Sequence, residues 1–284
     1  MTRCLKSRRN VLIDSYAKIN LSLRVLGKRP DGYHEIETLF STINLHDSLK
    51  FALTKKPSIK ILSNIAELCS ENNLAYLVAQ RIRADFGIKD GLEIYIDKRI
   101  PVAAGLGGGS SNAAVTFLAL CKLFKIDMEE SYMQSTAAEF GSDINFFFCG
   151  GLAKGESKGE KVTPLPDIEM MELLLVNPGI AISSREAYQL ADENVIECPP
   201  SGLWFNSLEA GIRKKYKVVD DILCDLKNSG GAEVMMSGSG STCIGLFEDK
   251  AMQNKALNLF QSKNIWCQVV KTLTRRQYQD VLKA

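Results

Sequence analysis

The chain has 284 residues, of which 45% are hydrophobic and 24% are charged, and its formal net charge at pH 7 is +2. This composition is ordinary for a globular protein, and the length allows about two domains. The nearly neutral charge offers no footprint for nucleic acid, which favours a clustered basic surface. No segment approaches the ~18 consecutive apolar residues of a membrane-spanning helix. We therefore expect no nucleic-acid partner and no membrane partner.

The N-terminal segment and the cysteines indicate the cellular compartment in which the protein is expected. The first ten residues carry four basic side chains and no acid, and the sequence that follows is too polar for a secretory signal. We expect a solvated terminus there. The eight cysteines are scattered singly, and two histidines are too few for a multi-histidine metal site. This pattern favours neither a zinc site nor a disulfide framework, and it predicts a cytoplasmic, reducing location.

The first third of the chain shows alternating and then helical patterns. Residues 20–27 alternate apolar and polar side chains, which predicts a half-buried strand. The sequence KRPDGY (28–33) has the signature of a turn, and extended structure resumes over 34–43. Residues 72–87 place their apolar side chains on one face of a predicted helix that closes at Gly87.

A glycine-rich stretch interrupts the middle of the chain. Residues 92–100 alternate as a strand and lead into PVAAGLGGGSSNAA (101–114), which is followed by apolar residues at helical spacing. A second helix is predicted around 131–140, ending at Gly141. Residues 154–166 are predicted to be a turn-rich connection, with the boundary of two domains directly after it, at 1–166 and 167–284.

The last part mixes strands and helices. A strand is predicted at 171–178, and Ser183 and Glu186 have the spacing of a capping box that begins a helix. Helical segments around 207–228 and 250–263 flank strands near 233–236 and 243–247. Strands and helices do not alternate regularly, which favours an α+β fold.

The strand–glycine–helix junction predicts a phosphate-binding loop. A helix N-terminus has unpaired N–H groups and a partial positive charge that attract anions, and glycines let the backbone approach a phosphate closely. Ser110 and Ser111 add hydroxyl donors at the helix start. A flexible turn is the alternative. The P-loop pattern needs a lysine that is absent here, and the dinucleotide pattern fails at Ser110.

The glycine-rich stretch resembles the P-x-x-x-G-L-G-S/G-S-S-S/A motif of the GHMP kinases. Two further segments agree: AKINLSLRVLGKRPDGYHEIETLF (17–40) and MSGSGSTCIGLF (236–247), with GSDINFFF (141–148) between them. Within this superfamily DGYHEIETLF is similar to the branch that acts on 4-diphosphocytidyl-2-C-methyl-D-erythritol. The match runs over most of the chain.

The resemblance implies a two-domain α+β fold with the active site in the cleft between the domains. The N-terminal domain would be of the ribosomal-protein-S5-domain-2 type and the C-terminal domain ferredoxin-like. ATP and Mg²⁺ are the implied cofactors, with the metal held by serine hydroxyls or only by phosphates and water. The residues expected at ATP are Pro101, Val102, Ala103, Ala104, Gly105, Leu106, Gly107, Gly108, Gly109, Ser110 and Ser111.

Two residues are expected to carry the chemistry. Asp143 precedes an apolar run, where a carboxylate is poorly solvated unless a cation answers it. By resemblance that cation is Lys18, which would keep Asp143 ionised and able to accept the proton of an attacking hydroxyl. A structural ion pair or a helix-capping Asp is the alternative. The implied reaction is ATP-dependent phosphorylation of the 2-hydroxyl of the methylerythritol unit, in isoprenoid-precursor synthesis.

The resemblance also implies a substrate site. Tyr33 and Tyr188 would stack on the cytosine, since stacking is worth ~1–3 kcal/mol per base, and His34 would contact its edge. A loop at 237–241 would close over the site, although a hairpin turn is the alternative there. Without the resemblance the two tyrosines are ordinary boundary residues. The complete set expected at the substrate is Asn20, Tyr33, His34, Asn73, Tyr188, Gly238, Ser239 and Gly240.

The chain departs from the family pattern at two places. Ile144 and Asn145 stand where Val-Pro is usual, and GESKGE stands where an arginine usually occurs, so Lys158 or Lys161 is expected to replace it. Two alternatives are a mevalonate-type or homoserine-type kinase and a non-catalytic nucleotide or sugar sensor. DGYHEIETLF and the tyrosine pair argue against the first alternative. The presence of both Lys18 and Asp143 argues against the second.

Overall fold

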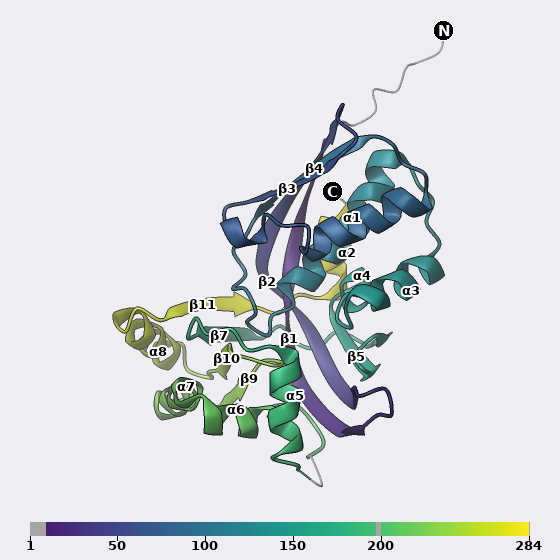
Figure 1. The fold of residues 1–284 in the computed structure, drawn as a ribbon. Coiled ribbons are helices and arrows are strands. Elements are labelled where there is room, and N and C mark those ends of the chain that lie inside the picture. The colour runs from purple at the N-terminus through teal and green to yellow at the C-terminus, as the bar shows by residue number, and fades with distance from the viewer. Residues whose placement is uncertain (1–9, 197–199, 284) are drawn as a thin grey trace.

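The computed structural model describes residues 10–196 and 200–283, which form two sheets with helices packed on them (Figure 1). The first sheet has seven strands in the order β3-β4-β2-β1-β8, with β5 on the other half of β2 and β6 beside β5. Its strands are β1 (Asn10–Lys28), β2 (His34–Thr54), β3 (Ile59–Ser63), β4 (Gly91–Asp97), β5 (Leu152–Ser157), β6 (Lys161–Pro164) and β8 (Phe205–Asn206).

The long antiparallel pair β1–β2 is the centre of this sheet. The predicted strand at 20–27 is confirmed but begins earlier, at Asn10, and the predicted turn at 28–33 joins it to β2. All residues of β1 from Ala17 to Arg24 are buried, so both of its faces are covered. The pairing shifts register between Tyr16 and Lys18 and again between Asn20 and Ser22. Such irregularities re-aim side chains and are frequent beside functional sites.

Helices cover one face of the first sheet. The helices predicted from apolar periodicity at 72–87, after the glycines and at 131–140 are confirmed. Their apolar faces enclose one core with β1, β2 and β4. These elements are η1 (Ala66–Leu68), α1 (Leu74–Asp85), α2 (Gly108–Phe124), α3 (Glu130–Phe140) and α4 (Phe146–Cys149).

The second sheet has four antiparallel strands in the order β11-β7-β10-β9. The predicted α+β class is confirmed, because antiparallel strands and helices occur here without regular alternation. Ser183 caps α5 by accepting a hydrogen bond from the Glu186 N–H at 3.1 Å, as the capping-box spacing predicts. The elements are β7 (Glu172–Asn177), α5 (Ser184–Asp192), α6 (Glu209–Lys215), α7 (Lys217–Asn228), β9 (Glu233–Met236), β10 (Cys243–Leu246), α8 (Lys250–Ser262) and β11 (Trp266–Lys271).

The two sheets are joined by a common apolar layer and by returning chain segments. Ile19 and Leu21 of β1 pack with Leu173 and Leu175 of β7. Strand β8 returns to pair in parallel with β1, and the last helix, α9 (Arg275–Lys283), contributes Tyr278 to the first core. Two domains divided at residue 166 therefore stay a prediction, with parts of the second segment lying on the first sheet.

The prediction of a turn-rich connection over 154–166 is wrong. This segment is largely the hairpin of β5 and β6, and β5 pairs with β2. The glycines and lysines of this segment obscure the alternating pattern of a strand. Gly155 occurs within the strand because neighbouring side chains leave no room for a Cβ. A Cβ there would lie 2.5 Å from the Phe40 ring and 2.9 Å from the Thr38 methyl. The short or late elements β3, β8, β11 and α9 were also not predicted.

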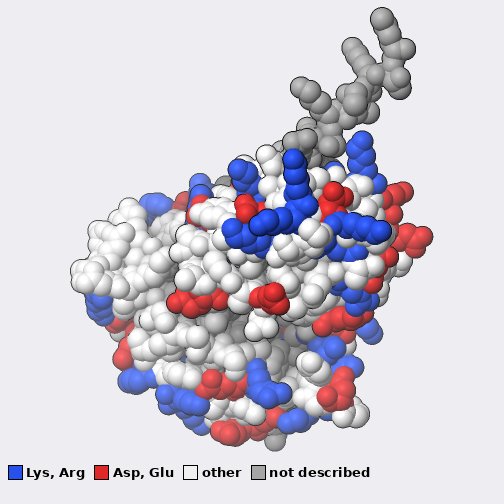
Figure 2. All heavy atoms as spheres, turned by 45° about the horizontal axis from the view of Figure 1, so that its top comes forward, with Lys and Arg blue, Asp and Glu red and all other residues white. Residues whose placement is uncertain are grey.

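Charged side chains of both signs are interspersed on the face shown in Figure 2. Among the described residues, no helix combines the length and the apolarity that crossing a membrane requires. The face in Figure 2 is therefore not dominated by one kind of charge.

Tyr278 should be essential for stability. Its side chain is fully buried, and its hydroxyl donates to the Phe147 carbonyl at 2.6 Å. Tyr278→Ala should lower the free energy of unfolding by about 3–5 kcal/mol, because it leaves a cavity in the core. The exposed Asp280→Ala on the same helix is the control and should change it by less than about 0.5 kcal/mol. Equal effects in denaturant unfolding would show that α9 is not part of this core.

Candidate active site

The glycine loop between β4 and α2 lies where other backbone segments approach closely. Gly105 and Gly107 have φ values of +76° and +68°, in the left-handed region that favours glycine. A Cβ on Gly105 would lie 2.1 Å from the Ser237 carbonyl oxygen, and one on Gly107 would lie 2.9 Å from Lys18 Cγ. The loop can therefore have no side chain at either position.

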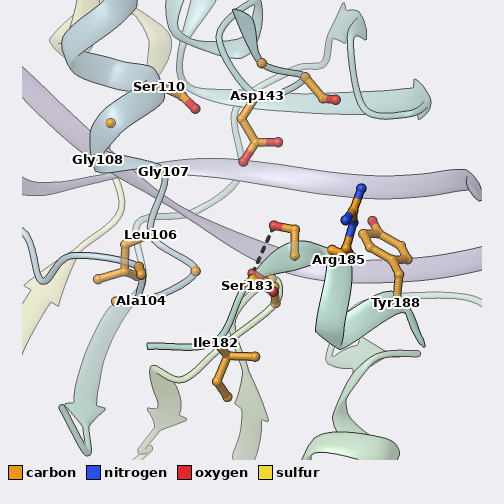
Figure 3. A pocket seen from close by; sticks show the side chains of 18 of the residues that line it. Ala104, Leu106, Gly107, Gly108, Ser110, Asp143, Ile182, Ser183, Arg185 and Tyr188 are labelled. Carbon is orange, nitrogen blue, oxygen red and sulfur yellow. Dashed lines mark hydrogen bonds between the residues drawn. The ribbon is translucent and has the colours of Figure 1, made fainter. Parts of the chain in front are cut away.

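The N-terminus of α2 opens toward a cavity of about 1030 Å³. Gly107 is its N-cap and provides no side-chain capping bond. The first N–H groups, those of Gly108, Gly109 and Ser110, have no acceptor inside the helix. All three residues line the cavity, and Figure 3 shows the Ser110 side chain beside it. Free amides and a helix dipole make this end suited to an anion.

Lys18 and Asp143 meet at this cavity, as the sequence predicted. Lys18 Nζ lies 3.1 Å from Asp143 Oδ2, and Lys18 is only 3% exposed. The Lys18 backbone N–H donates to the Leu106 carbonyl at 3.0 Å, which ties β1 to the glycine loop. Asp143 enters from the turn before α4, and its side chain is 31% exposed toward the cavity (Figure 3). The pair thus places a buried ammonium group and an accessible carboxylate at the cavity.

The second glycine-rich loop, residues 237–241, packs directly on the first. Ser237 Oγ donates to the Gly105 carbonyl at 3.3 Å, and the Thr242 N–H donates to the Ala104 carbonyl at 3.3 Å. A Cβ on Gly238 would lie 3.0 Å from Asn20 Oδ1. The two loops therefore form one wall of the same cavity.

Aromatic side chains line another part of the cavity. Tyr33 is 56% exposed, and Lys158 Nζ lies 4.6 Å from the centre of its ring. The Tyr188 ring is stacked on His34, with centroids 4.8 Å apart and planes 15° apart. One face of Tyr188 is thus covered by His34. Burial raises the pKa of Tyr188, and the charge of Asp143 adds to this effect, so Tyr188 stays neutral.

Most of the residues predicted from the sequence line this cavity, but three of them, Ser111, Gly240 and Asn73, differ from the expectation. Ser111 and Gly240 do not line it. Ser111 is fully buried, and its hydroxyl accepts a hydrogen bond from Ser15 at 2.7 Å. Asn73 lines the cavity, yet its side chain caps α1 by accepting from the Ala75 N–H. Lys158 is at the cavity, and Lys161 is not.

Several cavity residues were not predicted, because each depends on a contact between distant segments. Asp192 lies 2.6 Å from His34 Nε2 and 2.7 Å from Lys28 Nζ. Its position four residues after Tyr188 on a helix is the only signal in the sequence. Lys28 is the main cause that lowers the pKa of Asp192, and His34 contributes to it. This carboxylate is therefore ionised and holds His34 in place.

Two further cations, Lys98 and Arg185, line the cavity, and they differ in whether an acidic side chain pairs with them. Lys98 is buried 2.9 Å from Asp47, beneath Gly108. Burial lowers its pKa, while Asp47 opposes this shift. The side chain of Arg185, in the first turn of α5, makes no ion pair or hydrogen bond with any residue that the structure describes. Figure 3 shows its side chain extending beside Tyr188 toward the level of Asp143.

The site suits a metal that arrives with its ligand. No group of three or more His, Cys, Asp or Glu side chains able to hold a metal occurs in the described part of the chain. Mg²⁺ is commonly bound by one or two protein groups together with phosphates and water. The Ser110 hydroxyl and the Asp143 carboxylate are the cavity groups that fit this mode.

Family models match both halves of the chain. The model for the GHMP kinases N terminal domain matches residues 73–151, and the model for the GHMP kinases C terminal domain matches residues 200–264. The first match contains the glycine loop and Asp143, and the second contains the loop at 237–241.

Curated relatives are similar over almost their whole length. The 4-diphosphocytidyl-2-C-methyl-D-erythritol kinase of Thermodesulfovibrio yellowstonii is 37% identical, over 91% of this chain and 96% of the relative. The protein of that name from Syntrophomonas wolfei subsp. wolfei is 35% identical, over 90% and 96%.

Solved structures show the same fold. A crystal structure of 4-(cytidine 5'-diphospho)-2C-methyl-D-erythritol kinase superposes with a TM-score of 0.78 and 28% identity, over 92% of this chain and 99% of the other. Homoserine kinase from Cytophaga hutchinsonii has a TM-score of 0.70 at 16% identity, over 96% and 97%. The second similarity concerns the fold alone.

The contact between the two glycine loops should be sensitive to one methyl group. Gly105→Ala should lower the free energy of unfolding by about 2 kcal/mol or more, because the left-handed backbone costs an L-residue about 1–2 kcal/mol and the Ser237 carbonyl must move. Gly109→Ala is the matched control, since its Cβ would meet only Leu74 at 3.7 Å. It should be neutral or stabilise by up to about 1 kcal/mol. Equal stability of the two variants in denaturant unfolding would contradict this description of the loops.

Proposed function

The chain belongs to the GHMP kinase family and, within it, to the 4-diphosphocytidyl-2-C-methyl-D-erythritol kinases, and we propose that it transfers the γ-phosphoryl group of ATP to the 2-hydroxyl of 4-diphosphocytidyl-2-C-methyl-D-erythritol. The observation that carries this proposal is the Lys18–Asp143 pair beside the free amides of α2. A phosphoryl-transfer enzyme must mainly position two reactants and stabilise charge. A single cavity of about 1030 Å³ is consistent with two ligands lying together.

The proposed chemistry follows from the positions of the two side chains. Asp143 accepts the proton of the 2-hydroxyl as that oxygen bonds to the γ-phosphorus of ATP. The bond from the γ-phosphorus to the β,γ-bridging oxygen breaks, and ADP leaves with the electron pair. Lys18 faces Asp143 at 3.1 Å and stabilises the negative charge on the transferring group. Holding the two reactants in line is worth about 7–11 kcal/mol of the barrier.

The glycine loop provides the proposed triphosphate site. The amides of Gly108, Gly109 and Ser110 donate to phosphate oxygens, and the α2 dipole favours their charge. Mg²⁺ bound with ATP would neutralise further phosphate charge, and the Ser110 hydroxyl or the Asp143 carboxylate would help to hold it. Ser111 contributes indirectly, because its bond to Ser15 anchors the helix start to β1.

The cytidine diphosphate is proposed to lie along α5. Tyr33, with more than half of its surface exposed, offers a face on which a base can stack. Arg185 precedes Tyr188 by three residues and therefore lies about one helical turn away on the same face. Since the described residues include no acidic partner for it, Arg185 is free to bind the substrate diphosphate, and Lys158 is the second candidate. Arginine suits phosphate because its donors form a planar fork.

The location is proposed to be the cytoplasm. Cys69, Cys121, Cys149, Cys224, Cys243 and Cys267 are all free thiols in the structure. Thiols persist in reducing compartments, where ATP is also available as a partner.

The function is tested by mixing the protein with ATP, Mg²⁺ and the cytidylyl substrate and following a new phosphomonoester by phosphorus NMR. Asp143→Asn should lower kcat by at least about 100-fold, because general base catalysis is worth about 10²–10⁴-fold, and should still bind ATP. Asp225→Asn, which breaks the surface pair with Lys263, is the control and should retain full activity. ADP release without a new phosphorus signal, or activity on mevalonate or homoserine instead, would refute the proposed substrate.

The substrate side is tested separately. Tyr33→Ala and Arg185→Gln should each raise KM for the cytidylyl substrate by about 5- to 100-fold, since a stacked base or a charged hydrogen bond is worth about 1–3 kcal/mol, and leave KM for ATP unchanged. Arg276→Gln, in the first turn of α9 and outside the cavity, is the control for lost charge. An equal loss of affinity for both ligands would indicate structural damage rather than lost substrate contacts.

A further inference from the structure

We propose that Thr38 is a positioning residue for Lys18, acting through the side-chain amide of Asn20; this inference rests on the proposed function. Thr38 lies on β2 with no exposed surface, and it does not line the cavity. Asn20 Nδ2 donates to Thr38 Oγ1 at 2.7 Å, and Lys18 Nζ donates to Asn20 Oδ1 at 2.6 Å. Three buried polar side chains therefore form one chain of hydrogen bonds that ends at the ammonium group.

The donor and acceptor of each hydrogen bond in this series are determined by the bond between Thr38 and the Ser22 carbonyl. Thr38 Oγ1 donates to the Ser22 backbone carbonyl at 2.6 Å. A carbonyl can only accept, so the single hydroxyl hydrogen of Thr38 is used there. The hydroxyl can then only accept from Asn20, which requires the NH₂ group of Asn20 to face it. The amide oxygen consequently faces Lys18, the orientation that suits a cation.

Packing holds the Thr38 hydroxyl in this position. The methyl group of Thr38 points at the β5 backbone, where a Cβ on Gly155 would lie only 2.9 Å from it. A β-branched side chain has few χ1 choices. With the methyl against Gly155, the hydroxyl is directed to the β1 side, between Asn20 and Ser22. The absence of a side chain at Gly155 therefore makes room for the Thr38 methyl group.

The consequence for Lys18 is a defined direction for its last donor. Its ammonium group has three N–H donors. One is directed to Asn20 Oδ1, one faces Asp143 Oδ2 at 3.1 Å, and the Phe40 ring lies 5.2 Å below it. One N–H therefore remains for a phosphoryl oxygen. If the Asn20 amide turned over, its NH₂ group would face the ammonium and push Lys18 out of place.

Two conservative changes test the hydroxyl and the methyl group of Thr38 separately. Thr38→Val keeps the shape but removes the hydroxyl, and Thr38→Ser keeps the hydroxyl but removes the methyl. We expect Thr38→Val to lower kcat by about 10-fold, the effect of one buried hydrogen bond on a rate, with KM for ATP changed less than about 2-fold. Thr38→Ser should restore kcat to within about 3-fold of the wild type.

Thr42→Val is the matched control. Thr42 is also fully buried on β2 and is paired with Lys18 across the β1–β2 ladder, but its hydroxyl accepts from the Gly151 N–H at 3.0 Å and is not part of the hydrogen-bond chain to the ammonium group. It should lose stability without a change in kcat. A Thr38→Val enzyme with wild-type kcat, or with the same profile as Thr42→Val, would overturn the proposal, as would equal losses in Thr38→Val and Thr38→Ser.

A measurement on the wild-type protein keeps the proposal testable if Thr38→Val does not fold. In NMR spectra the Asn20 side-chain NH₂ protons should exchange slowly with solvent and show a nuclear Overhauser effect to the Thr38 side chain. An Asn20 amide that exchanges freely or faces away from Thr38 would refute the relay. This result is independent of the substrate, so a failure of the relay and a failure of the proposed kinase function are distinguishable.

Discussion

A lysine that is almost wholly buried needs an opposite charge, and this need joins Lys18 of β1 to Asp143 before α4. Burying an ammonium group without a partner is costly, so the two segments must meet wherever else the chain runs. Their meeting point determines what surrounds them. The glycine loop must pass over the Lys18 side chain, and Gly107 allows this because it has no Cβ. The ion pair thereby places a carboxylate, a cation and a helix N-terminus around one space.

The charges of the cavity fall into two groups with different consequences. Lys18, Lys28 and Lys98 each have a carboxylate within about 3 Å and are held in place by it. Removing one member of the buried Lys98–Asp47 pair would leave an uncompensated charge. Arg185 makes no such pair with any described residue and lies at the more exposed side, along α5. We interpret the paired cations as the fixed frame of the site, and Arg185, with Lys158 as the second candidate, as a cation that acquires its partner when a ligand binds.

Much of this arrangement could be predicted from local pattern. The strand, the glycines and the amphipathic helix after them identify the anion site, and the resemblance of short motifs pairs Lys18 with Asp143. The features that were not predicted depend on contacts between distant segments, which leave no local pattern in the sequence. The β5–β6 hairpin was not predicted because Gly155 is required by its close packing against Phe40 and Thr38 of β2, and the local sequence does not show this contact. Asp192 acquires its role from His34 and Lys28, and Ser111 turns inward to Ser15 rather than to the cavity.

Catalysis at this site requires a triphosphate bound at the N-terminus of α2 and the acceptor hydroxyl at Asp143. The most direct measurement is a crystal structure of the protein with a non-hydrolysable ATP analogue and 4-diphosphocytidyl-2-C-methyl-D-erythritol. We expect phosphate oxygens on the amides of Gly108, Gly109 and Ser110, and the 2-hydroxyl within about 3 Å of an Asp143 oxygen. A triphosphate bound away from these amides, or a 2-hydroxyl remote from Asp143, would contradict this arrangement.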